Sequence, residues 1–276
     1  MSTVTAPYGT VVLTGATSGI GEATARRLAA SSRHLVLLGP QPEGEVAGVL
    51  DGIRSAGPAR VDYVRADFTH LAEVPVAARE VRELAPAIDL LINDAGVPGA
   101  PERLITDDGF ERTLQVNALA PALFTRMLVP ALADGARIVN VGSSAHRVES
   151  FHLDDPDLAR GYTPVAAYAR AKLAMVAWSS LLALEEAGTA HDVVALCPGL
   201  NDTPLSAAMM GRIGGSPNVG AAHVLAAAAA DVPSGSYLEG DRVVAPSAEV
   251  TDPGNRARLA RLFTERLTPF ASRSAR

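Results

Sequence analysis

The sequence predicts an α/β fold: one doubly wound domain with a mostly parallel sheet of about seven strands and helices on both faces. Short apolar runs alternate with helical segments along the chain, which is typical of a parallel sheet covered on both sides. The first apolar run leads directly into a glycine-rich turn. Chemically distinctive residues follow the apolar runs, and ligands bind beyond the carboxyl ends of the strands in such sheets.

Composition limits the classes of protein to which the chain can belong. Of its 276 residues, 48% are hydrophobic and 20% are charged, which indicates a globular protein. A net charge of −6 argues against nucleic acid and anionic membranes as partners. The single cysteine, Cys197, excludes an intrachain disulfide, and the six histidines show no metal-ligand spacing. We therefore predict no metal site.

Because the sequence shows no repeat or linker, we predict a single domain over residues 1–276. Residues 1–10 lack the pattern of a signal peptide, and the longest apolar run, near residues 225–230, is too short to span a bilayer. The expected location is the cytoplasm, without membrane contact.

The first strand, turn and helix predict a phosphate site. Residues 10–14 form the strand, Gly15, Gly19 and Gly21 give the turn its GxxxGxG spacing, and the helix covers residues 22–30. This order of elements presents backbone N–H groups and a positive dipole end to a pyrophosphate.

Apolar runs, periodicity and turn residues predict the other elements in the same way. Residues 88–92 are almost continuously apolar, as expected of a strand buried on both faces. Residues 146–164 are polar and aperiodic, and a loop of that length is usually functional or mobile. The other predicted strands are 34–38, 61–64, 137–141, 192–196, 236–239 and 242–244. The other predicted helices are 43–55, 71–84, one or two within 110–132, 168–186, 202–213, 219–230 and 255–267.

The end of the second strand leaves the form of the dinucleotide open. An acidic residue there would bind the ribose 2′-hydroxyl of NAD, and a nearby arginine would bind the 2′-phosphate of NADP. The sequence has Gly39, Pro40 and Gln41, which provide neither group.

Tyr168 and Lys172 are the main candidates for acid–base chemistry. On a helix they lie one turn apart on the same face. An ammonium about 4 Å from the phenol would change the energy of the phenolate by about 4 kcal/mol, enough to lower the phenol pKa from about 10 into a useful range. Lys172 is the one lysine in the chain, which supports a special role for it. Taken alone, so short a pattern also fits an ordinary helix surface.

Together, these motifs resemble the short-chain dehydrogenase/reductase superfamily. The motifs are Thr14 to Gly21, Asn93 to Gly96, Asn117, Ser143 and Tyr168-x-x-x-Lys172, in this order. Residues 138–146, the long interval from Ser143 to Tyr168 and the ending from residue 235 resemble its retinol-dehydrogenase-like branch. The resemblance covers essentially the whole chain. It implies a Rossmann-type fold and an NAD(P)-dependent oxidoreductase.

The resemblance implies a role for each catalytic residue. Tyr168 would be the general acid/base, and Lys172 would lower its pKa and hold the nicotinamide ribose. Ser143, rather than Ser144, would orient the substrate carbonyl or alcohol, and Asn117 would hold a proton-relay water through its main chain. The implied cofactor contacts are Gly15, Thr17, Ser18, Gly19, Ile20, Gly21, Asp67, Phe68, Asn93, Ala95, Gly96, Tyr168, Lys172, Pro198, Gly199 and Thr203.

Three residues depart from the family pattern. Gly142 replaces a common serine, which should leave catalysis intact. Asp94 replaces a second asparagine and is expected to add negative charge near the adenosine. Pro40 stands where NADP-preferring members often carry an arginine. We expect NADP or NAD as the cofactor, with a slight lean to NADP from the branch resemblance.

Residues 200–216 are predicted to form a loop or lid over a lipophilic substrate. Their apolar, methionine-containing pattern suits such a lid, although a stripe of this kind equally suits core packing. The predicted substrate contacts are Ser143, His146, Leu205 and Met209. The expected substrate is a small lipophilic alcohol or ketone.

The helices around residues 114–132 and 165–184 are apolar nearly all round, which suggests packing against a copy of the chain. The resemblance also implies a homodimer or homotetramer. Two other functions stay open: a catalytically silent nucleotide-binding sensor or scaffold, and an epimerase or dehydratase that works through a transient carbonyl.

Overall fold

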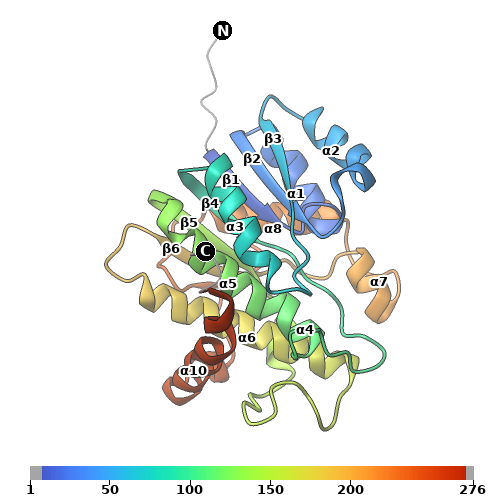
Figure 1. Ribbon diagram of the computed structural model, residues 1–276, viewed down its shortest axis with the longest axis vertical. Helices are drawn as coiled ribbons and strands as arrows, with labels where there is room; N and C mark the ends of the chain where they lie inside the picture. The colour runs from blue at the N-terminus through green and yellow to red at the C-terminus, as the bar shows by residue number, and fades with distance from the viewer. Residues whose placement is uncertain (1–7, 272–276) are drawn as a thin grey trace.

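A computed structural model describes residues 8–271, which form an eight-stranded sheet flanked by helices (Figure 1). The strand order is β3-β2-β1-β4-β5-β6-β7-β8, parallel as far as β7, with β8 antiparallel to β7. The predicted α/β class is confirmed, with eight strands in the sheet where about seven were expected. The strands are β1 (Tyr8–Thr14), β2 (Ser32–Gly39), β3 (Arg60–Arg65), β4 (Ile88–Asn93), β5 (Leu132–Val141), β6 (Asp192–Cys197), β7 (Tyr237–Glu239) and β8 (Arg242–Val243).

The helices follow the predicted order with adjusted ends. They are α1 (Gly19–Ala29), α2 (Ala47–Arg54), α3 (Glu73–Leu84), α4 (Arg112–Leu114), α5 (Ala120–Leu128), α6 (Pro164–Glu185), α7 (Pro204–Met210), α8 (Pro217–Ala229), α9 (Ala248–Thr251) and α10 (Pro253–Ala271). The 3-10 turns are η1 (Glu43–Glu45), η3 (Val129–Ala131) and η4 (Ser144–Arg147), and η2 (Gln115–Leu119) is a π-helix. Within residues 8–271 no helix combines the length and apolar character needed to cross a bilayer.

The sheet separates two hydrophobic cores. Successive side chains of a strand point to opposite faces, so Val12 and Leu91 join one core while Leu13 and Leu90 join the other. Helices α3, α5, α6 and α10 cover the first core, and α1, α2 and α8 cover the second. Burial on both faces explains why the central strands are almost continuously apolar.

The predicted helix over residues 110–132 is divided into four pieces. Glu111 caps α4 by accepting a hydrogen bond from the Leu114 N–H at 2.8 Å, the π-helix η2 follows, and α5 ends in the turn η3. A π-helix inside a helical stretch often marks a functional position. Here it contains Asn117.

The C-terminal helix α10 packs on α6 and α5, at the lower side of the molecule in Figure 1. Trp178 and Leu182 of α6 share a core with Phe263 and Leu267 of α10. The sequence pattern had suggested that the outer face of α6 meets a second copy of the chain. Because α10 of the same chain buries much of this face, the apolar pattern of α6 no longer indicates a second copy. Self-association stays a prediction from the family resemblance alone.

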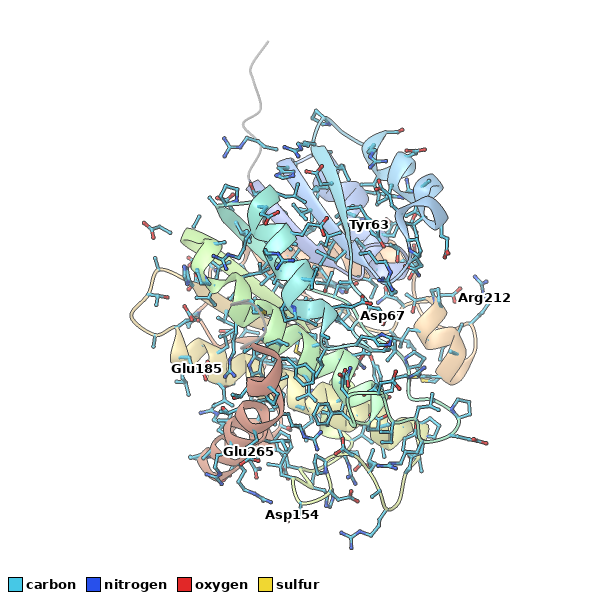
Figure 2. All side chains as sticks on the ribbon, viewed as in Figure 1. Tyr63, Asp67, Asp154, Glu185, Arg212 and Glu265 are labelled. Carbon is cyan, nitrogen blue, oxygen red and sulfur yellow. The ribbon has the colours of Figure 1, made fainter. Side chains whose placement is uncertain are left out.

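The long loop between η4 and α6 is also attached to the C-terminal region. Arg258 pairs with Asp154 at 2.9 Å, and Arg266 forms an ion pair with Asp157. The Phe151 N–H donates to the Glu249 carboxylate at 3.2 Å. Figure 2 shows Asp154 at the outer edge of this loop. The loop that enters the Tyr168 helix is therefore held by α9 and α10.

We predict that Phe263→Ala lowers the free energy of unfolding by about 3–5 kcal/mol, because the side chain is fully buried between α10 and the core. Chemical denaturation measures the change. Val243→Ala is the control, since Val243 is 55% exposed and its truncation should cost less than about 0.5 kcal/mol. Similar losses in both variants would contradict the packing described for α10.

Candidate active site

One cavity of about 840 Å³ lies at the carboxyl edge of the sheet. Its wall is built from the ends of β1 to β6, the start of α1, part of α6 and the segment around α7. This volume is at the upper end of the range typical of small-molecule and cofactor sites.

The glycine turn forms one side of the cavity. Gly15 has φ of +74°, and a Cβ there would lie 2.8 Å from the Ala95 Cα, so only glycine fits. Ser18 is the N-cap of α1 but makes no side-chain cap, which leaves the Gly19 and Ile20 amides available, whereas the Gly21 amide donates to Asp94. Across the cavity, the Thr203 methyl approaches Gly19. Free amides at a helix N-terminus fit the pyrophosphate of a dinucleotide.

The residues after β2 and β3 form the end of the cavity where the sequence predicts the adenosine. The Thr17 hydroxyl donates to Gln41 Oε1 at 3.2 Å, and the Tyr63 hydroxyl donates to the Gln41 carbonyl at 2.8 Å. Asp67, which is labelled in Figure 2, lines the cavity and accepts hydrogen bonds from Thr69. Among the described residues, the charged groups lining the cavity are Asp67, Asp94 and Lys172, and no arginine is among them.

Two of the predicted cofactor residues, Asn93 and Gly21, lie beneath the cavity surface. Asn93 is buried, and its amide donates to Thr125 Oγ1 at 2.9 Å and Asn140 Oδ1 at 2.8 Å, which links β4 to α5 and β5. Gly21 packs against the Gly15 carbonyl, where a Cβ would lie 2.1 Å from that oxygen. Neither residue lines the cavity. The other predicted cofactor contacts do line it: Gly15, Thr17, Ser18, Gly19, Ile20, Asp67, Phe68, Ala95, Gly96, Tyr168, Lys172, Pro198, Gly199 and Thr203.

Tyr168, Ser143 and Lys172 come together in this cavity. Ser143 hydrogen-bonds the Tyr168 phenol. The Lys172 Nζ donates to the Val141 carbonyl at 2.7 Å and lies 5.8 Å from the centre of the Tyr168 ring. Tyr168 and Lys172 share one face of α6, as expected from their spacing.

The electrostatics of this cluster differ from the sequence-based expectation. Burial raises the pKa of Tyr168 to about 12, although the hydrogen bond from Ser143 opposes the rise. Burial also lowers the pKa of Lys172 to about 8, against the attraction of Asp94. We expected the ammonium to lower the phenol pKa directly. That expectation is wrong, because desolvation dominates and the ammonium points to the Val141 carbonyl.

Asn117 lies in the π-helix η2 and is buried. Its side chain accepts from the Val97 N–H at 2.8 Å and donates to the Val97 carbonyl at 3.0 Å. The side chain is thus committed to the loop after β4 and does not line the cavity. The predicted role of its main chain in holding a relay water stays a prediction.

His146 was predicted as a substrate contact, but the structure places it in the interior. It is fully buried, its Nδ1 lies 2.7 Å from the Ser143 carbonyl, and its Nε2 accepts from the Ser247 N–H at 3.1 Å. Its ring meets the edge of Tyr237 at 4.8 Å between centroids. Burial lowers its pKa. His146 therefore connects η4 to the C-terminal segment and does not reach the substrate cavity.

The segment predicted as a lid crosses the cavity mouth. Leu205 and Met209 of α7 line the cavity, whereas the predicted helix over 202–213 ends at Met210 because Gly211 has φ of +80°. Thr203 caps α7 by accepting from the Ser206 N–H at 3.2 Å. Just after α7, the exposed Arg212 (labelled in Figure 2) pairs with Asp202 at 2.9 Å.

Asn201 is a site residue that the sequence reading missed. It is 3% exposed, its amide donates to the Pro198 and Gly199 carbonyls, and its Oδ1 accepts from the Gly220 N–H at 2.9 Å. It therefore fixes the base of the lid to α8. The sequence signal for this role is the polar side chain that follows Pro198-Gly199. Its hydrogen-bond partner, Gly220, lies 19 residues further along the chain. Cys197, at the end of β6, also lines the cavity.

Within residues 8–271 no group of three or more metal-ligating side chains could hold a metal ion. The cavity instead has the glycine turn, helix N-terminus and hydroxyl groups that fit a dinucleotide.

Comparison with known proteins identifies relatives of the chain. Residues 9–211 match the family model of the short chain dehydrogenases. Mouse polyprenol dehydrogenase is 38% identical over 72% of this chain, and the match covers 62% of that protein, so less than two-thirds of its length. Mouse retinol dehydrogenase 13 is 32% identical over 91% of this chain and 81% of its own.

A solved structure is also similar. A short chain dehydrogenase from Burkholderia cenocepacia J2315 in complex with NADP is 26% identical, with a TM-score of 0.67, covering 84% of this chain and 95% of that one. The retinol-dehydrogenase-like resemblance is thereby confirmed, and NADP is the cofactor that the neighbouring solved structure contains.

We predict that Gly15→Ala weakens dinucleotide binding at least about tenfold, because the new Cβ would meet the Ala95 backbone at 2.8 Å in a left-handed conformation. Fluorescence titration with NADPH and NADH measures the dissociation constants. In the control Gly44→Ala the new Cβ meets nothing within 4 Å, so binding should be unchanged. Unchanged binding by Gly15→Ala would show that the turn is not the dinucleotide site.

Proposed function

Because this chain belongs to the short-chain dehydrogenase family, we propose that it is an NAD(P)-dependent oxidoreductase acting on a lipophilic alcohol or carbonyl compound. The observation that carries this proposal is the meeting of Tyr168, Ser143 and Lys172 in one cavity with an open helix N-terminus. The reaction would move a hydride between the nicotinamide and the substrate carbon. When bound, the dinucleotide supplies or accepts that hydride.

The chain's own residues would hold the cofactor at two places. The glycine turn and the first amides of α1 fit the pyrophosphate, and Lys172 is the cation in the described cavity wall that can bind a ribose hydroxyl. Thr203 and Gly199, on the opposite wall, would enclose the nicotinamide half.

Tyr168 would handle the proton. In reduction, the carbonyl carbon gains the hydride and the carbonyl oxygen takes the phenol proton. A C–H bond and an O–H bond thus form, and the C=O double bond becomes a single bond. A pKa of about 12 keeps the phenol protonated at neutral pH, as reduction requires. Oxidation requires the phenolate, which the Ser143 hydrogen bond and a charged Lys172 would stabilise. Ser143 would also donate to the substrate oxygen and orient it.

An apolar mouth supports a lipophilic substrate. Val148, Val165, Leu205, Met209 and Met210 all line the cavity. Two relatives are named for the long-chain alcohols polyprenol and retinol, which agrees with this surface. We propose that residues 200–216 act as a lid, hinged at the base that Asn201 fixes. The single-domain organisation, self-association and cytoplasmic location stay predictions.

We predict that Tyr168→Phe lowers kcat for reduction of a lipophilic ketone by about 10²–10⁴-fold, because the proton donor is lost while the ring is kept. Absorbance at 340 nm follows the oxidation of NADPH or NADH. The control is Tyr162→Phe: this phenol donates to the Ala100 carbonyl and does not line the cavity, so kcat should stay within about twofold.

Different outcomes separate the alternative functions. Equal turnover by wild type and Tyr168→Phe would contradict the proposed mechanism. Tight dinucleotide binding without turnover of any apolar alcohol or ketone would favour a sensor or scaffold. A changed product without net oxidation or reduction of the cofactor would favour an epimerase or dehydratase.

We predict that Pro40→Arg shifts the preference toward NADP by about tenfold, because Pro40 lines the adenosine end and no arginine is present in the described cavity wall. The measurement is the ratio of the dissociation constants for NADP and NAD in both proteins. An unchanged ratio would place the 2′ position of the ribose away from Pro40.

A further inference from the structure

Asp94 is a cavity carboxylate that the proposed hydride transfer does not use. It follows β4, and its backbone N–H donates to the Thr14 hydroxyl at 3.1 Å. Its side chain accepts a hydrogen bond from the Gly21 N–H, and a Cβ on Gly21 would lie 2.7 Å from Asp94 Oδ2. Gly21 belongs to the first turn of α1. The chain therefore places its own carboxylate at the helix end that fits the pyrophosphate.

This position differs from the expectation drawn from the sequence. We expected the extra negative charge near the adenosine, where Thr17, Gln41 and Asp67 lie. Asp94 instead lies between the N-terminus of α1 and Lys172. Lys172 is also close to the turn that contains Asp94, since its Nζ would be 3.7 Å from a Cβ on Gly96. The Thr14 hydroxyl and the Gly21 N–H fix the position of Asp94, because they hold the turn after β4 against the start of α1.

The groups facing Asp94 carry few compensating charges. Lys172 of α6 is the cation that attracts it, and Tyr168 of α6 also interacts with it electrostatically. Cys197 of β6 interacts with both Tyr168 and Lys172. The elements β1 and α1 contribute the uncharged Thr14 hydroxyl and Gly21 amide. Burial raises the pKa of Asp94 to about 7, and Lys172 and the Gly21 amide only partly oppose this rise.

We propose that Asp94 competes electrostatically with the dinucleotide for the positive end of α1 and for Lys172, so that cofactor binding is accompanied by proton uptake at Asp94. This inference rests on the proposed dinucleotide site. A pyrophosphate bound at the same helix end adds negative charge beside the carboxyl group and favours its neutral form. Reciprocally, ionisation of Asp94 at higher pH weakens cofactor binding.

The first test compares dinucleotide binding from pH 5.5 to pH 8.5 in wild type and Asp94→Asn. Asparagine keeps an oxygen for the Gly21 N–H but carries no charge. The wild-type dissociation constant is expected to rise about tenfold across this range, while that of Asp94→Asn changes clearly less. NADPH and NADH are both used, because the 2′-phosphate of NADPH titrates on its own and should affect both proteins equally.

Calorimetry in two buffers of different ionisation enthalpy measures the proton uptake directly. Wild type should take up protons on binding near pH 7, and Asp94→Asn should take up fewer. Asp107→Asn is the matched control: it removes a carboxylate that is 94% exposed and does not line the cavity, and should keep the wild-type proton uptake. Parallel pH profiles and equal proton uptake in wild type and Asp94→Asn would overturn the inference for Asp94 alone. Failure of the wild type to bind either dinucleotide at any pH would overturn the proposed function with it.

A measurement on the cofactor-free protein provides a second readout. The carboxyl pKa is higher in the folded chain than in the unfolded chain, so between about pH 4 and pH 7 the folded chain holds the extra proton. Stability from this group therefore falls as the pH rises through that window. The Tm of wild type should fall relative to that of Asp94→Asn from pH 5 to pH 8. A constant difference in Tm would overturn the inference.

Discussion

Parallel pairing of the first seven strands determines where chemistry can occur in this chain. Because their carboxyl ends lie at one edge of the sheet, residues separated by more than 180 positions, such as Gly15 and Gly199, line one cavity. Apolar side chains occupy both faces of the sheet, so the polar and glycine residues of the site gather at this edge. The site follows from the way the sheet is built.

Burial controls the acid–base properties of the site more strongly than proximity does. A phenol, an ammonium and a carboxyl group are crowded into a poorly hydrated space, and each shifts toward its neutral form: Tyr168 and Asp94 upward in pKa, Lys172 downward. Such opposed shifts are typical of sites that move protons. The electrostatic state of the cavity thus depends on the charge that a ligand brings, since the described wall has a single ammonium.

Much of the fold and the site was predictable from local pattern. The glycine turn, the strand ends and the one-turn spacing of Tyr168 and Lys172 are short-range features, and all three lie where the pattern placed them. The failures concern long-range contacts. His146 was assigned to the mouth by its position in the chain, but a partner 101 residues away holds it in the interior. Asn201 was overlooked for the same reason. The apolar outer face of α6 suggested a second subunit because nothing local reveals that α10 returns to cover it.

The packing of α10 against α6 has a consequence for how this protein can diversify. The family match ends at residue 211, yet the later segment supports the helix that carries Tyr168 and Lys172 from behind. Because α10 supports the rear face of α6, Tyr168 and Lys172 keep their positions when residues at the cavity mouth are substituted. New substrate preferences could therefore arise at the opening without disturbing the reacting atoms.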